Sequence, residues 1–154
     1  PVGEGLKAAL STLTDGRIAI ASQAVGVAAA AFDATVEYAT DDHAGEPIIE
    51  RQVVAHRLAE MQTQVQAARL LARDGARKNE DDVDPVAASM AKYFASETAV
   101  DVTNDALQLH GHGGYTTRFD IERYFRDAKV TTIYEGTSEI QKELISRHLT
   151  FRQG

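Results

Sequence analysis

The chain consists largely of long segments rich in alanine, leucine and charged residues, and only 3 prolines interrupt its 154 residues. β-Branched residues seldom alternate with polar ones, although a half-buried strand requires that alternation. Apolar residues instead recur at spacings of three, four or five, which places them on one face of a helix. These patterns predict an all-α fold.

The first predicted helix runs from about residue 6 to residue 39. Gly45 and Pro47 should end it, because both residues favour a turn. A second helix should follow from about residue 48 to residue 78. The residues expected to be buried by these two helices are Leu6, Leu10, Leu13, Ile18, Ala21, Val25, Ala28 and Phe32 in the first, and Val54, Leu58, Met61, Val65, Ala68 and Leu71 in the second.

A third helix should begin at the Asp84-Pro85 step, since aspartate is a favoured N-cap and proline a favoured first helical residue. We expect it to end at Gly111 and to bury apolar residues on one face, namely Met90, Phe94, Val100 and Leu107.

Two shorter helices are predicted near the C-terminus, from about residue 121 to residue 128 and from about residue 138 to residue 148. Ser138 and Gln141 have the spacing of a capping box at the start of the second. Three long helices and a C-terminal one make an up-down four-helix bundle the expected architecture.

Length and composition narrow the class of protein. A chain of 154 residues has the length of a single domain. Its composition, with 44% hydrophobic and 25% charged residues, is typical of a soluble globular protein. A net charge of −7 without a basic tract argues against nucleic-acid binding. Charged residues interrupt every apolar run before the ~20 residues that a membrane span needs, so none is predicted. The absence of cysteine excludes disulfides and thiolate chemistry, and no secretion signal is recognised, so we do not expect a secreted protein.

Two motifs near the C-terminus carry a resemblance to a known family. They are Gln108-Leu-His-Gly-His-Gly-Gly-Tyr115 and the run from Arg126 to Gln141, which includes Tyr-Glu-Gly-Thr. With Leu13 to Gly26, Gln52 to Met61 and Ala67 to Leu71, they resemble, in the same order, the C-terminal domain of acyl-CoA dehydrogenases, nearest to short-chain members. These are FAD-dependent enzymes that desaturate acyl-CoA thioesters.

The resemblance covers nearly the whole chain and implies that residues 1–154 form a single C-terminal bundle domain. The family's N-terminal helical domain and middle β-domain would then lie outside this chain. We therefore expect this fragment by itself to bind negligible FAD and to be inactive.

Glu135 is the candidate catalytic residue. By position alone it could simply complement the dipole of the following helix. The resemblance implies that it is the general base, which takes the α-proton of the thioester while the β-hydrogen leaves as hydride to the flavin. Some relatives carry the base just before the Arg of the first helix, but that position is Gly16 here. Tyr134 and Gly136 flank the base, and the glycine would let the chain approach substrate closely.

Arg17 follows Gly16 and matches the stretch that lines the substrate end of the family's site. The alternative is an exposed helix charge, which is the commoner role for arginine. Both interpretations remain open from the sequence.

The resemblance implies two groups of flavin contacts. The segment from Gln108 to His112 resembles a Gln-x-x-Gly-Gly segment that reaches across a subunit interface to the adenine dinucleotide half of FAD, with His112 in place of the second glycine. Gly111 could also be a plain helix C-cap. Residues 137–139 (Thr137, Ser138 and Glu139) match a second contacting stretch, and Gln52 matches another. No metal site is expected, because His110 and His112 have no third ligand.

One departure from the family lies upstream of Gln52. Most members have an Arg followed by Phe-Gly there, and this Arg reaches the partner subunit's flavin pyrophosphate; this chain reads Asp41-Asp-His-Ala-Gly45. An acidic pair such as Asp41 and Asp42 would repel a pyrophosphate. Either the remaining contacts hold FAD, or this subunit pairs with a related, different one.

Several alternatives follow for function and assembly. The chain could belong to a dehydrogenase with electron-transferring flavoprotein as acceptor, to an acyl-CoA oxidase, or to a non-catalytic bundle subunit. Its apolar faces favour a homodimer or tetramer, or a heteromer with a related subunit. A bacterial cytoplasm or a mitochondrial matrix would suit it.

Overall fold

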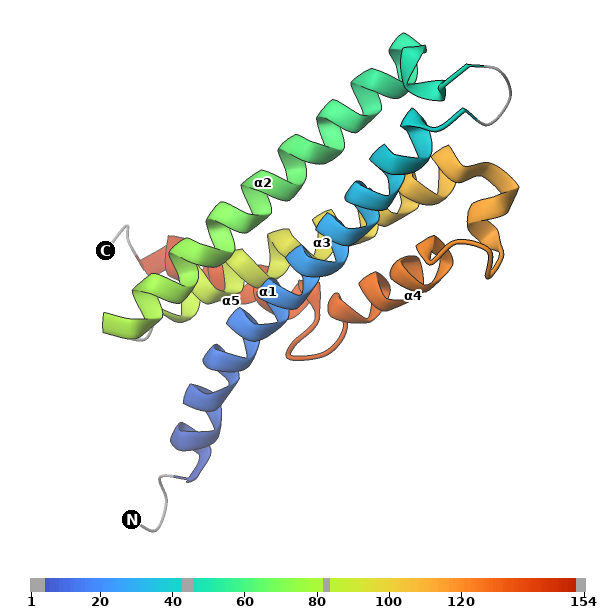
Figure 1. Cartoon of the computed structure of the whole chain (residues 1–154). Helices are drawn as coiled ribbons and strands as arrows, with labels where there is room; N and C mark the ends of the chain where they lie inside the picture. Colours follow the sequence, from blue (N-terminus) through green and yellow to red (C-terminus); the bar gives the residue numbers. More distant parts are fainter. Residues whose placement is uncertain (1–4, 43–45, 82–83, 152–154) are drawn as a thin grey trace.

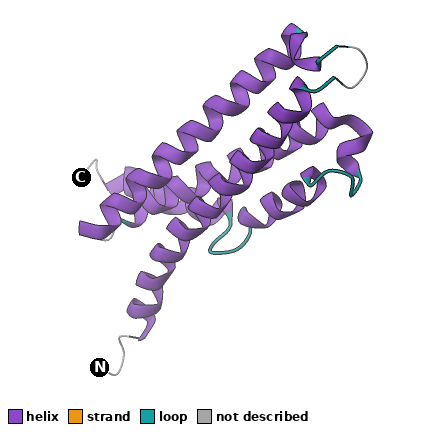
Figure 2. Ribbon diagram, viewed as in Figure 1, coloured by secondary structure: helices purple, strands orange, loops and turns teal. Residues whose placement is uncertain are grey.

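The computed structural model describes residues 5–42, 46–81 and 84–151. Within these ranges there are helices and turns and no strand, so the predicted all-α fold is confirmed (Figure 2). The elements, in chain order, are α1 (Gly5–Thr40), the 3-10 turn η1 (Ile48–Glu50), α2 (Gln52–Asp81), α3 (Pro85–His110), the 3-10 turn η2 (Gly111–Tyr115), α4 (Ile121–Thr131) and α5 (Ser138–Phe151).

The helices form a bundle in which α3 is central (Figure 1). Helices α1, α2 and α3 pack against one another, α4 packs against α1 and α3, and α5 packs against α3. The N-terminal turns of α1 project beyond the other helices. The predicted helical bundle is therefore confirmed, with two short helices in place of a single fourth one.

The ends of α3 form as the sequence predicts. The Oδ1 atom of Asp84 accepts hydrogen bonds from the backbone N–H of Val86 at 3.0 Å and of Ala87 at 2.9 Å, and the helix ends at Gly111 with φ +58°. The second helix differs: η1 and the extended Arg51 precede it, and α2 begins only at Gln52. This turn allows Ile48 and Ile49 to pack against the core.

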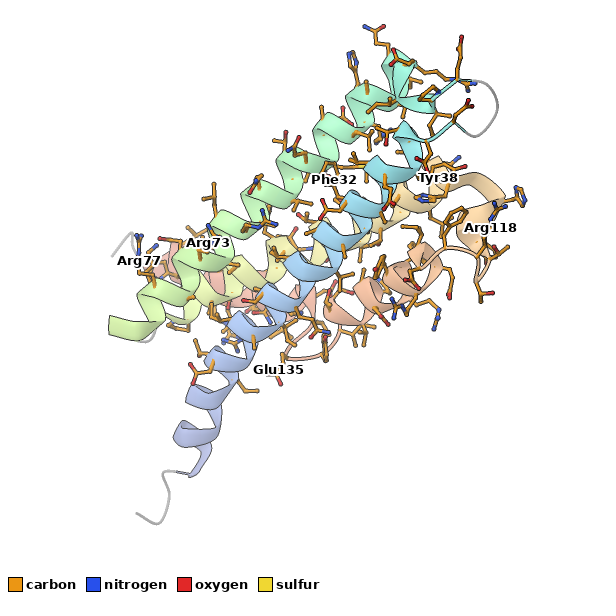
Figure 3. All side chains as sticks on the ribbon, in the orientation of Figure 1. Phe32, Tyr38, Arg73, Arg77, Arg118 and Glu135 are labelled. Atoms are coloured by element: carbon orange, nitrogen blue, oxygen red, sulfur yellow. The ribbon has the colours of Figure 1, made fainter. Side chains whose placement is uncertain are left out.

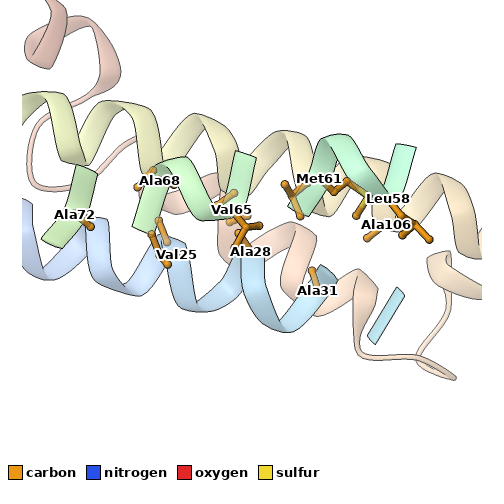
Figure 4. Packing of buried hydrophobic residues seen from close by; sticks show 14 of the residues in the cluster. Val25, Ala28, Ala31, Leu58, Met61, Val65, Ala68, Ala72 and Ala106 are labelled. Carbon is orange, nitrogen blue, oxygen red and sulfur yellow. The ribbon is translucent and has the colours of Figure 1, made fainter. Parts of the chain in front are cut away.

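The core is built mainly from alanine (Figure 4). Small side chains let helix axes approach closely, since the distance between packed helices depends on the side chains at their contact. The predicted core residues that are buried are Ala21, Val25, Ala28, Val54, Leu58, Met61, Val65 and Ala68.

Two predicted core residues are wrong: Leu13 is 38% exposed and Met90 is 41% exposed. On α3 the fully buried face carries alanines, among them Ala91, Ala95 and Ala99. The sequence pattern favours the larger apolar side chains as the buried ones, whereas close packing of α3 against α1 requires small side chains at the contact. The side chains of Leu6 and Leu10 lie outside the described part, and the remaining predicted core residues are half-buried: Ile18, Phe32, Leu71, Phe94, Val100 and Leu107.

The segment Leu13–Thr40 of α1 is long and apolar enough, by length and composition alone, to cross a membrane. Core helices of water-soluble bundles meet the same criterion. Here Ala21, Ala24 and Ala31 are fully buried against neighbouring helices, and 33% of the apolar window is buried in all. That the protein has no membrane span stays a prediction.

Candidate active site

The Tyr-Glu-Gly-Thr segment forms the turn between α4 and α5. The backbone N–H of Ser138 donates to the carbonyl of Thr132 at 3.1 Å, which brings the two ends of the turn together. The hydroxyl of Tyr134 donates to Oε1 of Gln23 on α1 at 2.9 Å. Burial raises the pKa of Tyr134 above its usual value, partly offset by this hydrogen bond. The turn is thus tied to α1 as well as to its own helices.

The start of α5 differs from the predicted capping box. Thr137 is the cap: its Oγ1 lies 3.5 Å from the backbone N–H of Ile140, and its carbonyl accepts from the N–H of Gln141. Ser138 is buried, and its hydroxyl donates to Oε1 of Glu97 on α3. The capping residue is therefore one position earlier than the sequence predicts, because Thr137 and Ser138 are adjacent and both residue types can cap a helix.

Glu135 has an unusual backbone conformation. Its φ is +52°, and it is the one non-glycine residue in the described ranges with a positive φ. Such a conformation costs about 1–3 kcal/mol and persists only where the surroundings impose it. Gly136 follows with φ +90°. A Cβ on Gly136 would lie 2.6 Å from Nε2 of Gln141, so this glycine is required by the packing beneath it as well as by its backbone.

The carboxylate of Glu135 points to α1. A Cβ on Gly16 would lie 2.8 Å from its Cδ and would clash with its Oε2. Arg17 is only 8% exposed, so its interpretation as an exposed helix charge is wrong. Burial lowers the pKa of Arg17, and the nearby charge of Glu135 opposes this shift.

Two buried polar atoms of this pair have no hydrogen-bond partner in the described part of the chain, namely Nε of Arg17 and Oε2 of Glu135. Buried polar atoms are normally satisfied, and exceptions call for an explanation. Two unsatisfied, oppositely charged groups beside a glycine mark a place where a polar group of a ligand can be received.

The remaining candidates on α5 differ in exposure. Thr137 is half-buried, Ser138 is buried and Glu139 is exposed. Hydrogen bonds from its own backbone N–H and from the Thr137 hydroxyl lower the pKa of Glu139. Only Thr137 and Glu139 therefore present their side chains toward the outside of the domain.

A second group of candidates lies at the other end of α3. Gln108, Gly111 and His112 are all exposed there. Gln52 is also exposed, and an ion pair of 3.2 Å between Arg57 and Asp105 joins the beginning of α2 to this end of α3. A cavity of about 410 Å³ opens beside these residues, with a lining that includes Tyr38, Gly111, His112 and Arg118.

His110 is close to these exposed candidates in sequence but is itself buried. It is the last residue of α3 and only 4% exposed, and its Nδ1 lies 2.7 Å from the carbonyl of Ala106. Its ring stacks on Tyr38 at 4.1 Å, and Phe119 meets both rings edge-on. The sequence carried no signal for this aromatic cluster, because its members come from three separate elements.

The two groups are far apart within one chain. Helix α3 carries Lys92 beneath the Glu135 turn and His110 at its other end, and 18 residues at ~1.5 Å per residue separate them by ~27 Å. In Figure 3 the labelled Glu135 lies apart from Tyr38 and Arg118, which lie together toward the other end of the bundle. A single chain therefore does not bring the candidate base and the end of α3 to one site.

The structure also reveals residues that sequence reasoning missed. Lys92 donates to the carbonyl of Gly136 at 2.7 Å, and Gln141 donates to the carbonyls of Glu135 and Gly136 at 3.1 and 3.0 Å. Both side chains are fully buried. A lysine is normally exposed, so nothing in the sequence pointed to one beneath the turn.

Comparison with known proteins places this arrangement in a class. The family model of the acyl-CoA dehydrogenase C-terminal domain matches residues 3–150. The chain belongs to the acyl-CoA dehydrogenase family and represents its C-terminal domain.

Individual relatives agree with this assignment. The chain is 44% identical over 150 residues to a 3-(aryl)acrylate reductase of Clostridium sporogenes, covering 96% of this chain and 40% of that protein. It is 45% identical over 149 residues to the mitochondrial short-chain specific acyl-CoA dehydrogenase of Rattus norvegicus, covering 96% and 36%. The structure of butyryl-CoA dehydrogenase from Megasphaera elsdenii superposes with a TM-score of 0.93 at 40% identity, covering 96% and 39%. The chain thus spans about two fifths of the length of these relatives.

Proposed function

We propose that this domain forms part of an FAD-dependent acyl-CoA dehydrogenase that introduces an α,β double bond into acyl-CoA thioesters. The observation that carries the proposal is the carboxylate of Glu135, set on a strained turn against Gly16 and beside the buried Arg17, with Oε2 lacking a hydrogen-bond partner in the described residues.

Glu135 acts as the general base in this proposal. Because Oε2 of Glu135 accepts no hydrogen bond in the described residues, it is free to accept the α-proton of a thioester placed against it. Arg17 supplies positive charge next to the carboxylate. Tyr134 and Gly136 hold the turn at the substrate, Tyr134 through Gln23 and Gly136 through its φ of +90°.

The end of α3 suits a nucleotide-containing cofactor. Gln52 and Gln108 present exposed carboxamides, and Gly111 has a positive φ with no atom within 4 Å of the place that a Cβ would occupy. Arg118 lines the adjoining cavity and offers a charge for a phosphate. FAD held there would supply the acceptor for the β-hydrogen, which leaves as hydride and carries both electrons; Thr137 and Glu139, beside the candidate base at the start of α5, would be further contacts.

The separation of about 27 Å along α3 supports an assembly in which one subunit supplies the base and its neighbour supplies the residues around Gly111. A homodimer or homotetramer meets this need. A heteromer with a related subunit meets it too, and is the alternative that the acidic Asp41 and Asp42 favour. An electron-transferring flavoprotein would reoxidise the flavin, and a bacterial cytoplasm or a mitochondrial matrix would house the enzyme.

The full-length protein that contains this domain should be purified and mixed anaerobically with butyryl-CoA, while the flavin absorbance is recorded. We expect bleaching in the wild type and its loss by about 10²–10⁴-fold in rate in Glu135→Gln. Glu143→Gln is the matched control, because Glu143 is exposed on α5 and pairs only with Arg147. Bleaching of Glu135→Gln at the wild-type rate would remove Glu135 as the base. A colourless wild-type protein would indicate a partner-dependent or non-catalytic subunit.

A further inference from the structure

Lys92 on α3 is the largest fully buried side chain in the described residues, with 0% exposure. Its Nζ donates to the carbonyl of Gly136, 44 residues further along the chain. Burial lowers the pKa of Lys92 below its usual 10.5, which means that the protein interior disfavours the ammonium. A buried cation is weak evidence of a contribution to stability, since an apolar side chain of similar volume often serves the fold as well.

The charges around Lys92 come from four elements. Burial has the largest effect on the pKa of Lys92 and lowers it. Glu97 on α3 has the next largest effect and raises this pKa, as do Glu139 on α5 and Glu135 on the turn. Arg17 on α1 lowers it. Of these groups Glu139 is exposed, whereas Arg17 and Glu135 belong to the candidate active site. The ammonium therefore lies within the field of the charged groups of that site.

The hydrogen bonds beneath the turn determine its backbone. Lys92 and Gln141 both donate to the carbonyl of Gly136, and Gln141 also donates to the carbonyl of Glu135. Because peptide units are planar, and none of those described is cis, fixing two successive carbonyls fixes the two peptide planes on either side of Gly136. The two planes together set φ and ψ of Gly136, so these bonds support its φ of +90°, next to the strained φ of +52° at Glu135.

We propose that Lys92 is a positioning residue for the base: its bond to the carbonyl of Gly136 holds the turn in the conformation that directs the Glu135 carboxylate at Gly16. The inference rests on the proposed function, because positioning matters only if Glu135 is the base. Lys92 touches no substrate or cofactor in this role and acts through the backbone.

The test uses the full-length flavoprotein with three variants. Lys92→Met has a similar length but no donor, Lys92→Gln keeps a donor without the charge, and Lys78→Met removes an exposed lysine at the far end of α2 as a matched control. We expect Lys92→Met to lower kcat for butyryl-CoA oxidation at least about tenfold, while KM stays within about threefold. Lys92→Gln should recover part of the loss, and Lys78→Met should match the wild type. Hydrogen exchange in a peptide covering residues 132–141 should be faster in Lys92→Met, and to a smaller extent in Lys92→Gln, than in Lys78→Met, without a lower melting temperature.

Equal kcat and equal exchange in Lys92→Met and Lys78→Met would overturn the proposal. Should Lys92→Met fail to fold, Lys92→Gln decides by the same comparison with Lys78→Met, and unchanged kcat and exchange would again overturn it. Failure of the proposed function is distinguishable: if neither the wild type nor Glu135→Gln oxidises butyryl-CoA, the function is wrong, while the exchange measurement still decides whether Lys92 holds the turn.

Discussion

Replacing Gly16 by alanine tests the placement of the base with a single methyl group. The new Cβ would lie 2.8 Å from Cδ of Glu135, whereas ordinary van der Waals contact begins at 3.4 Å. The carboxylate must therefore retreat by at least about 0.6 Å, and the clash with its Oε2 adds to this displacement. A misplacement of about 1 Å can cost about 10²-fold in rate, so we expect kcat to fall between about ten- and a hundredfold.

The free energy of unfolding should change much less than kcat. Gly16 lies inside α1, and replacing a glycine by alanine in a helix gains roughly 0.5–1 kcal/mol when the space is available. This gain offsets the local strain, so the free energy of unfolding should change little. A loss of activity in Gly16→Ala would then not be a consequence of unfolding.

The matched control is Gly26→Ala, ten residues further along the same helix. A Cβ on Gly26 would meet no atom within 4 Å, so this variant should gain the full helix propensity and keep its activity. Steady-state kinetics and urea unfolding of both variants in the full-length enzyme measure the two effects. If kcat of Gly16→Ala stays within twofold of Gly26→Ala, the carboxylate of Glu135 does not work from the place described.

Other predictions concern stability and pH. Asp84→Ala should lower the free energy of unfolding by about 1 kcal/mol in urea titrations, because two backbone N–H groups lose their acceptor; an unchanged midpoint would speak against the cap. Met61→Ala should cost about 2–5 kcal/mol, since Met61 is fully buried, and a loss below about 1 kcal/mol would mean that the core collapses around it. Gly136→Ala should lower the free energy of unfolding by about 1–3 kcal/mol, because alanine is strained at a φ of +90°. Adding Gln141→Ala should remove the clash between the new Cβ and Nε2 of Gln141, but not this backbone strain. Folding lowers the pKa of Lys92, so between that lowered value and 10.5 the folded chain binds fewer protons than the unfolded one. The free energy of unfolding of the wild type relative to Lys92→Met should therefore rise with pH in this window. A difference in melting temperature that does not change with pH would contradict the shift.

Local sequence was sufficient for the helices of this protein, whereas the candidate base was predicted from the resemblance of its motif to a known family. The Asp84-Pro85 step and Gly111 bound α3 because capping uses side chains and backbone angles within a few residues. Glu135 was identified by the motif around it. Periodicity also gave the buried face of α2, but on α3 it favoured Met90 over the alanines that are actually buried.

Only the tertiary structure decided what surrounds that base. The burial of Arg17, the proximity of Gly16 to the carboxylate and the support from Lys92 and Gln141 join residues of α1, α3 and α5 that are distant in sequence. A sequence pattern reports the preference of one segment for water or for a helix, whereas the environment of a charge depends on which other segments pack against it. The identity of the candidate base is therefore a property of the chain, and its strained backbone and its charged surroundings are properties of the bundle.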